Sequence, residues 1–367
     1  MKHIDMPLYN SLKKYAKKHT VRLHMPSHKG RLNFLPQAEK LDVTELGFND
    51  NLDKPCSVIK EAQDSFAQLF ESKNAIFLTN GASQGVFALL AACEGKILAQ
   101  KNCHISVIRG AKLFNKQLVF VDKPNASSVE EALNCDNKIK TVLLEYPNYF
   151  GINCDLSEIY KVTKEHNVLL LVDSAHGAHF GLSEYLPPHA AKICDACVVS
   201  THKTLGSLTQ TAVILTDNSF LAKKLKNNVN LVSSTSPSYV LLASIDYARS
   251  FAAKYAEKKL NRLYFDVNNF KKQISDTKIK VVENDDFTKL VLDFSGSGIS
   301  GKTIYSLLAK LNIFAELYDG YRVLFYLSMF TVKKDLNRLK NALLTILKNN
   351  SQKEDEPTAK GPFTYGD

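Results

Sequence analysis

Short, largely apolar runs alternate with amphipathic segments along the first 215 residues. The runs predict buried strands, and the segments between them place apolar residues three and four positions apart, as helices do. Strands are expected over 75–79, 96–99, 117–121, 141–145, 168–172, 196–199 and 211–215. Helices are expected over 58–70, 86–93, 106–115, 127–134 and 155–165. This alternation indicates an α/β fold with a mostly parallel sheet covered by helices.

The pattern changes after residue 215. Long helical stretches occupy 217–227 and 237–265, followed by short strands and two further helices. The strands are expected over 278–282, 289–294, 313–317 and 322–327, and the helices over 301–310 and 332–349. We predict an N-terminal helix (8–19) and arm within 1–40, a large domain over 41–265, and a small α+β domain over 266–350. The polar segment 351–367 is predicted to be disordered.

Composition and charge narrow the class of protein. The 367 residues are 45% hydrophobic and 23% charged, which is ordinary for a soluble globular chain. The net charge of +10 comes from lysines at helical spacing beside apolar residues, and no nucleic-acid-binding module accompanies them. We therefore expect solvated helix faces and no nucleic-acid partner. No signal peptide or membrane span is recognised, so neither a membrane association nor secretion is expected.

The cysteines favour a reducing compartment. Seven are scattered through apparent core segments, which suits the cytoplasm. Cys194 and Cys197 form a single CxxC, but no second pair stands at the spacing of a zinc site, so no metal is expected.

Two residues beside predicted strands suggest chemistry. Lys203 stands between the runs 196–199 and 211–215, where burial would lower the pKa of an amine and make it nucleophilic, although a solvated surface loop is the alternative. Asp173 ends the run 168–172, which would place its carboxylate in the ligand crevice of an open α/β sheet. A cofactor with a pyridine nitrogen and an aldehyde needs such a pair, the aspartate for the ring nitrogen and the lysine for a Schiff base.

A glycine-rich turn precedes the apolar helix. Gly81, Ala82 and Ser83 follow a strand and lead into that helix, where amide donors and the helix dipole attract an anion. They form a candidate phosphate cradle, and the alternative is a tight turn with an ordinary helix cap.

Several stretches together resemble a known family. They are 23–30 (LHMPSHKG), 42–46 (DVTEL), 79–85 (TNGASQG), 102–104 (NCH), 173–179 (DSAHGAH), 200–205 (STHKTL) and 207–210 (SLTQ). The sequence resembles the ornithine/lysine/arginine decarboxylases, which are fold-type I, aspartate aminotransferase-like, pyridoxal-phosphate enzymes. Relative to that family the chain is similar to a short variant without the usual C-terminal extension.

The resemblance implies an activity and a set of site residues. The activity is decarboxylation of arginine, lysine or ornithine to an amine and CO₂ in amino-acid metabolism and polyamine biosynthesis, through pyridoxal 5'-phosphate bound to Lys203. It implies that His104 stacks on the cofactor, that His176 lies beside it, and that Ser200 and His202 flank its phosphate. The implied catalytic set is Lys203, Asp173, His104 and His176. It further implies that the segment 22–30 crosses the cofactor cleft and that the chain forms a homodimer, or a higher homo-oligomer, with shared active sites.

Alternatives remain open at this point. The chain could run another pyridoxal-phosphate reaction, either amino transfer, with Arg322 as a candidate for the substrate carboxylate, or lyase chemistry. It could also be a catalytically silent binding or regulatory protein. The acidic residues Asp42, Glu45, Asp50 and Asp53 could receive a cationic substrate or merely cap a helix. Neither the choice of basic amino acid nor that of the proton donor, Lys203 or a nearby histidine, follows from the sequence.

Overall fold

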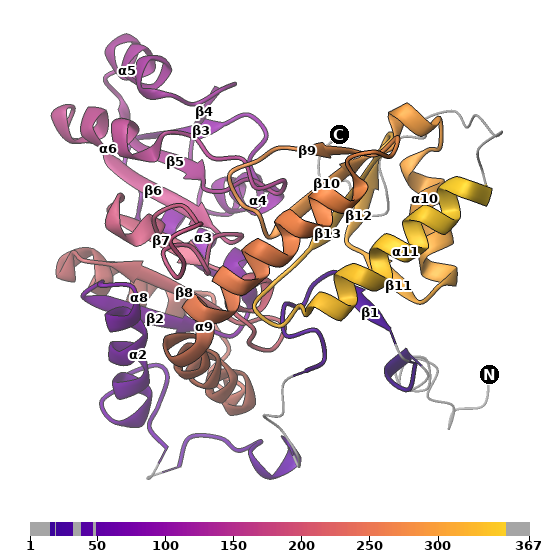
Figure 1. The fold of residues 1–367 in the computed structure, drawn as a ribbon. Helices are drawn as coiled ribbons and strands as arrows, with labels where there is room; N and C mark the ends of the chain where they lie inside the picture. The colour runs from indigo at the N-terminus through magenta and orange to yellow at the C-terminus, as the bar shows by residue number, and fades with distance from the viewer. Residues whose placement is uncertain (1–14, 19, 32–37, 47–48, 350–367) are drawn as a thin grey trace, which may run out of the picture.

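A seven-stranded sheet forms the centre of the larger part of the molecule (Figure 1). The computed structural model describes residues 15–18, 20–31, 38–46 and 49–349. The strand order is β2-β8-β7-β6-β5-β3-β4, with β8 antiparallel to both neighbours and the other pairs parallel. The strands are β2 (Asn74–Leu78), β3 (Lys96–Gln100), β4 (Leu118–Val121), β5 (Ile139–Glu145), β6 (Leu169–Ser174), β7 (Ala196–Val199) and β8 (Ala212–Thr216). The predicted α/β fold with a mostly parallel sheet is therefore confirmed.

Helices cover both faces of this sheet. Successive strand residues point to opposite faces, so Val142 and Leu144 pack in one apolar cluster and Leu143 packs in the other. The first face carries α2 (Val58–Leu69), α5 (Ala126–Cys135), α6 (Leu156–Glu165) and part of α9 (Tyr239–Ile274). The second face carries α3 (Gly81–Ala92), α4 (Ile105–Leu113) and α8 (Ser219–Leu231). Burial on both faces explains why the strands are continuous apolar runs.

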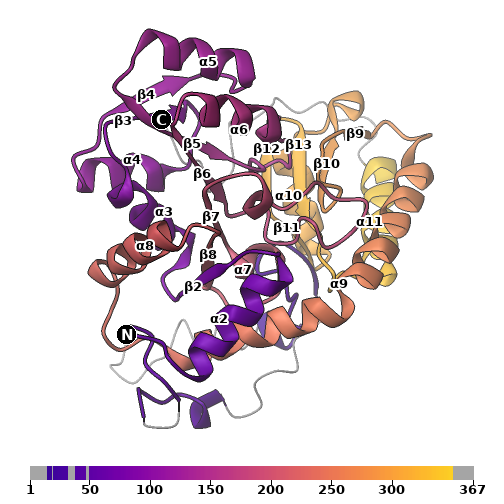
Figure 2. The same cartoon turned by 90° about the vertical axis from the view of Figure 1, so that its left-hand side faces the viewer.

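A smaller C-terminal α+β domain lies beside the large sheet (Figure 2). Its antiparallel sheet has the order β12-β13-β10-β9, and α9, α10 and α11 pack on one apolar cluster with it. The elements are β9 (Lys280–Val282), β10 (Lys289–Asp293), α10 (Gly301–Lys310), β11 (Ile313–Ala315), β12 (Leu317–Asp319), β13 (Arg322–Tyr326) and α11 (Lys333–Asn349). From the N-terminal arm, β1 (Val21–Leu23) pairs in parallel with β11 and buries Val21 and Leu23 in that cluster.

The 36-residue helix α9 belongs to both parts, and both views show it running between them (Figures 1 and 2). Leu260 packs in the core of the larger part and Leu263 in that of the smaller one. The predicted boundary at 265/266 falls inside this helix, and the division into domains at that residue stays a prediction.

Three local predictions need correction. Helix α3 begins at Gly81, five residues earlier than expected, because Gly81 adopts a φ of +74° and its N–H donates to the Gln210 carbonyl. The segment after β7 contains a one-turn helix, α7 (Thr201–Thr204), rather than loop alone. The expected strand over 313–317 is two strands, β11 and β12, separated at Glu316. Most of the expected helix 8–19 and the whole tail 351–367 lie outside the described residues.

Three short 3₁₀ helices complete the described elements. They span Ala38–Lys40, Ala190–Lys192 and Ser295–Ser297. Over the ranges that the structure describes, no helix combines the length and apolarity needed to cross a membrane. In the same ranges no three His, Cys, Asp or Glu side chains gather where they could hold a metal ion. All seven cysteines are described and free of disulfides.

A buried charge cluster joins the two parts. The side chains of Asp286 and Lys289 are 0% and 1% exposed, and Lys289 Nζ lies 3.0 Å from Asp286 Oδ2. Asp286 also accepts hydrogen bonds from the Thr288 hydroxyl at 2.6 Å and from His179, which follows β6, at 3.1 Å. Burial alone would raise the pKa of Asp286, but the charge of Lys289, supported by His179 and Thr288, holds that pKa well below its ordinary value.

We expect Asp286→Ala to lower the free energy of unfolding by about 3–5 kcal/mol, because it leaves the Lys289 ammonium buried without its partner. Adding Lys289→Met should recover part of this loss, since it removes the uncompensated charge. Urea unfolding followed by circular dichroism measures both effects. The control is Asp64→Ala, which breaks an exposed pair with Lys60 and should cost less than about 1 kcal/mol. Equal losses for Asp286→Ala and Asp64→Ala would contradict the prediction.

Candidate active site

A cavity of about 600 Å³ lies where the carboxyl ends of the sheet strands face the smaller domain. Nine residues proposed from the sequence line it: Gly81, Ala82, Ser83, His104, Asp173, His176, Ser200, His202 and Lys203. Met25 of the arm and the segment Glu316 to Asp319 of the smaller domain complete part of its wall. The fold thus brings the nine residues, which span more than 120 positions, into one cavity.

Lys203 lies on the one-turn helix α7 between β7 and β8. A cluster of buried hydroxyls fixes this turn: Ser207 Oγ bonds Thr201 Oγ1 at 2.7 Å, and Thr201 Oγ1 bonds Thr211 Oγ1 at 2.9 Å. The Lys203 Nζ lies 3.1 Å from His176 Nε2. Burial lowers the pKa of Lys203, while Asp173 and Glu145 oppose that effect. The result is an amine that is more readily deprotonated than a surface lysine.

Asp173 stands at the end of β6 and is only 5% exposed. Its Oδ1 accepts the Ala175 N–H at 3.0 Å, which fixes the carboxylate. Burial raises the pKa of Asp173, and the nearby Lys203 and His104 lower it. A buried carboxylate with these neighbours can hold a protonated ring nitrogen.

Glu145 is a second carboxylate at this edge. It ends β5, directly beside Asp173 in the register of the two parallel strands. Its Oε1 accepts the His104 backbone N–H at 2.5 Å. Burial, followed by the charge of Asp173, raises the pKa of Glu145 to about 8. Burial and the neighbouring Asp173 therefore keep Glu145 protonated to a higher pH than an exposed glutamate.

The opposite end of the cavity is suited to an anion. Gly81, Ala82 and Ser83 form the first turn of α3. The Gly81 N–H donates to the Gln210 carbonyl, and the N–H groups of Ala82 and Ser83 have no acceptor within the helix. Gly85, one turn further, allows close packing, since a Cβ there would lie 2.5 Å from Val198. His202 Nδ1 lies 3.0 Å from Ser200 Oγ and 3.1 Å from the Thr211 carbonyl. Burial lowers the pKa of His202 to about 4, so it is a neutral hydrogen-bonding group.

His104 begins α4 as its N-cap. Its Nδ1 accepts the Ser106 N–H at 3.2 Å and lies 2.8 Å from the Ser106 hydroxyl, which sets the ring orientation. Burial lowers the pKa of His104. An imidazole with a fixed orientation on the cavity wall can cover one face of a planar ligand.

The N-terminal arm contacts the lysine-bearing turn. Ser27 donates from its N–H, at 3.0 Å, and from its hydroxyl, at 3.1 Å, to the His202 carbonyl. Lys29 Nζ donates to the carbonyls of His24 and Tyr326 at 2.6 and 2.9 Å. The arm therefore connects the turn that carries Lys203 to the smaller domain.

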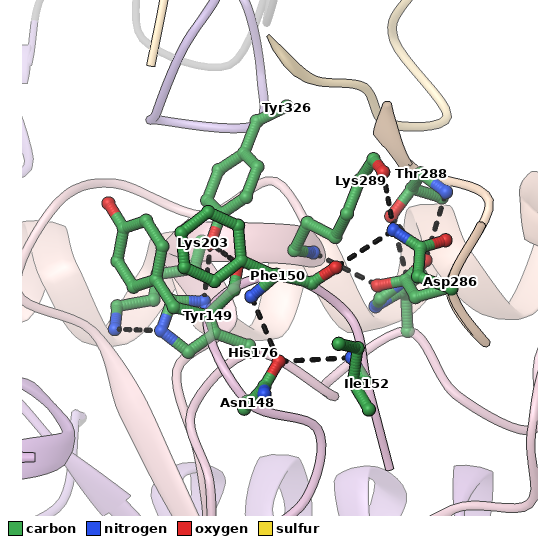
Figure 3. Close-up of polar contacts among 12 residues, drawn as sticks. Asn148, Tyr149, Phe150, Ile152, His176, Lys203, Asp286, Thr288, Lys289 and Tyr326 are labelled. Carbon is green, nitrogen blue, oxygen red and sulfur yellow. Dashed lines mark hydrogen bonds and ion pairs between the residues drawn. The ribbon is translucent and has the colours of Figure 1, made fainter. Parts of the chain in front are cut away.

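Sequence reasoning missed four residues here: Glu145, Tyr149, Glu316 and Tyr326. Glu316 lines the cavity and accepts hydrogen bonds from the Tyr149 hydroxyl at 2.7 Å and from the Met25 N–H at 2.8 Å. Tyr326 bonds His176 (Figure 3). Glu145 could have been found, because it ends a buried strand as Asp173 does. The other three have no such local signal.

Other polar candidates lie elsewhere. Asp42, Glu45, Asp50 and Asp53 are not among the residues that line the cavity. Asp50 instead accepts the N–H groups of Ser57 and Ile59 at the start of α2, where the Ser57 side chain makes no capping bond. Arg322 is exposed beside Asp293, 3.4 Å away, and is likewise not part of the lining.

The chain is similar to several bacterial proteins. Residues 6–293 match the family model described as Orn/Lys/Arg decarboxylase, major domain. The uncharacterized protein YaaO of Bacillus subtilis is 32% identical over an alignment of 358 positions, which covers 89% of this chain and 74% of that protein. The arginine decarboxylase of Bacillus subtilis is 27% identical over an alignment of 390 positions, which covers 96% of this chain and 80% of that protein.

Solved structures share the fold. The lysine decarboxylase of Francisella novicida superposes with a TM-score of 0.75 at 18% identity, over 93% of this chain and 60% of that one. The serine palmitoyltransferase of Sphingomonas wittichii superposes with a TM-score of 0.71 at 15% identity, over 90% of this chain and 88% of that one. The chain spans about 60% of the length of that lysine decarboxylase. With the match over 6–293, these findings identify the chain as a member of the ornithine/lysine/arginine decarboxylase family.

Proposed function

We propose that this chain catalyses the pyridoxal-phosphate-dependent decarboxylation of a basic amino acid, arginine, lysine or ornithine, to the corresponding amine and CO₂. The observation that carries the proposal is the common cavity of Lys203, Asp173 and His104. It combines an amine with a lowered pKa, a buried carboxylate and a flat imidazole.

The donor set of the cavity fits pyridoxal phosphate. Gly81, Ala82 and Ser83, with Ser200 and His202, would hold the phosphate, Asp173 the ring nitrogen, and Lys203 the aldehyde carbon. When bound, the cofactor supplies an aldehyde that condenses with amines and a ring that accepts the electron pair left by a broken Cα bond. A Cβ at Gly81 would meet nothing within 4 Å, so this side of the cradle has room for a ligand.

Lys203 and His176 form the hydrogen-bonded pair that we propose for proton transfer at the reacting carbon. Their nitrogens lie 3.1 Å apart, and both line the cavity. Lys203 must lose a proton to act as a nucleophile, and burial lowers its pKa in that direction. After CO₂ leaves, Cα needs a proton, which Lys203 Nζ can donate while His176 Nε2 accepts a hydrogen bond from the same nitrogen.

Asp173 and Glu145 differ in their charged neighbours. Burial and the charge of Asp173 raise the pKa of Glu145, whereas Lys203 and His104 oppose the rise that burial causes in the pKa of Asp173. We take Asp173 as the member of the pair that faces the ring nitrogen. Asp173 then keeps the ring nitrogen protonated, which the electron-accepting role of the ring requires.

The wall contributed by the smaller domain supports a basic amino acid as the substrate. The acidic residues Glu316 and Asp319 both line the cavity, and a carboxylate is the natural partner of an ammonium or guanidinium group. Arg322, which could have bound a carboxylate for amino transfer, is exposed and paired with Asp293, so that alternative is less well supported. We further propose a cytoplasmic homodimer with shared active sites.

We expect Lys203→Ala to abolish both the visible absorption band formed with pyridoxal phosphate and the release of ¹⁴CO₂ from carboxyl-labelled arginine, lysine and ornithine. The reason is that the only proposed attachment point for the aldehyde is removed. The control is Lys116→Ala, which removes a lysine that donates to the Cys93 carbonyl outside the cavity. A band with ketoacid but no CO₂ would indicate amino transfer, and a band without any turnover a silent binding protein.

We expect Glu316→Gln to raise the KM for the preferred basic amino acid about ten- to a hundredfold, because a charge-assisted hydrogen bond is lost. The spectrum of the bound cofactor should not change. Steady-state CO₂ release and an absorption titration measure the two properties. Glu283→Gln, which removes an exposed carboxylate beside Lys271, serves as the control. An unchanged KM would contradict the assignment of Glu316.

We expect Glu145→Gln to remove a pH dependence of stability in the cofactor-free protein. The pKa of Glu145 is about 8 in the folded chain against an ordinary 4.5, so the folded state holds an extra proton between these values. Wild-type stability should therefore fall, relative to the variant, as the pH rises from about 5 to about 8. Urea unfolding at several pH values tests this, and a constant difference would contradict it.

A further inference from the structure

We propose that Tyr326 is a positioning residue that fixes the tautomer of His176, with the proton on Nδ1, so that Nε2 accepts a hydrogen bond from Lys203. The inference rests on the proposed function only in taking Lys203 as the reacting amine. It assigns a role to a tyrosine of the smaller domain that does not itself line the cavity.

The contacts form a chain across the two parts of the molecule (Figure 3). Lys203 Nζ lies 3.1 Å from His176 Nε2, and His176 Nδ1 lies 2.8 Å from the Tyr326 hydroxyl oxygen. The same hydroxyl lies 3.2 Å from the Tyr149 carbonyl oxygen. His176 and Tyr149 belong to the larger part, and Tyr326 ends β13 of the smaller domain.

Counting hydrogens selects one arrangement. The phenol has one hydrogen, and the Tyr149 carbonyl can only accept. If Tyr326 donates to that carbonyl, His176 must donate from Nδ1 to the phenol oxygen, and its Nε2 is then free to accept from Lys203. All three contacts are hydrogen bonds in this arrangement. If Tyr326 instead donated to Nδ1, its contact with the Tyr149 carbonyl would lack a hydrogen.

The charges around His176 keep it neutral, so one proton must be assigned to one of two nitrogens. Lys203 from α7, Lys289 from β10, and His104 and His202 all face it, and these groups add to burial in holding its pKa well below the ordinary value. Burial also holds the pKa of the Tyr326 phenol well above its ordinary value, so the phenol keeps its hydrogen. The tautomer is therefore the remaining variable.

Tyr326 is held rigidly enough to determine which nitrogen of His176 carries the proton. It is 1% exposed. Its carbonyl accepts from Lys29 of the arm at 2.9 Å, and Lys289 Nζ lies 4.4 Å from the centre of its ring. A phenylalanine could fill this apolar strand position and keep the edge-on ring contact with His176, at 5.9 Å between ring centres, but only the hydroxyl forms the hydrogen bond to Nδ1. The role thus belongs to one oxygen atom.

The first test reads the tautomer directly in cofactor-free protein. Two-dimensional ¹H–¹⁵N spectra of histidine-labelled protein distinguish a protonated Nδ1 from a protonated Nε2, and the loss of one signal set in His176→Gln assigns the residue. We expect a protonated Nδ1 in the wild type and a mixture, or a protonated Nε2, in Tyr326→Phe. A wild-type proton on Nε2 would overturn the proposal.

The second test measures the pH at which the Lys203 amine becomes reactive. An Nε2–H directed at Lys203 disfavours the ammonium form, so Tyr326→Phe should move the pH midpoint for labelling Lys203 with an amine reagent down by about half to one unit. Mass spectrometry of the labelled peptide gives the midpoint. The matched control is Tyr239→Phe, which removes a buried tyrosine hydroxyl that donates to the Asp50 carbonyl outside the cavity. Equal midpoints for wild type, Tyr326→Phe and Tyr239→Phe would overturn the proposal.

Both tests use cofactor-free protein, so they succeed or fail independently of the proposed decarboxylation. If that activity is found, Tyr326→Phe should lower kcat about three- to tenfold with KM unchanged, since a net hydrogen bond of ordinary strength is lost and the substrate wall is intact. A rise in KM alone would instead indicate a structural effect on the cavity wall and count against the assigned role.

Discussion

The parallel register of three neighbouring strands determines the site. Because β5, β6 and β7 are parallel, Glu145 pairs with Asp173, and Asp173 pairs with Val198, just before the turn that carries Lys203. Side chains from three separate segments therefore emerge at one edge without any long loop having to fold back. A slip of one residue in β6 would turn Asp173 to the other face of the sheet and replace it with an apolar or hydroxyl side chain. The chemistry thus depends on backbone hydrogen bonds between strands that are largely apolar up to the ends that carry Glu145 and Asp173.

How much could be predicted from the sequence differs between the two sides of the cavity. On the sheet side, Lys203, Asp173 and the turn at Gly81 each follow an apolar strand, and the parallel topology carries strand ends to a common edge. That inference needs only local patterns. On the other side, Glu316 contacts Met25 across 291 positions and Tyr326 contacts His176 across 150. Such contacts depend on how two domains pack, which no local pattern encodes.

Contacts between residues distant in the sequence also explain why two predicted elements needed correction. The glycine-rich segment 81–85 was expected to be a turn because glycine is a poor helix former, yet tertiary packing against Val198 favours glycine there and the helix includes it. The run 313–317 forms two strands that are separated at Glu316, whose carboxylate bonds the Tyr149 hydroxyl and the Met25 N–H instead of lying in a regular strand. In both cases a neighbour distant in the sequence outweighs the intrinsic preference of the segment.

The helix α9 has a mechanical consequence. At 1.5 Å per residue its 36 residues span about 54 Å, and no proline or glycine interrupts them. One end of α9 packs in each apolar core, so a continuous helix rather than a flexible linker connects the two domains. Separation of the domains would require this helix to bend or one of its ends to leave its core. The length of this one helix thereby sets the distance between the two apolar cores.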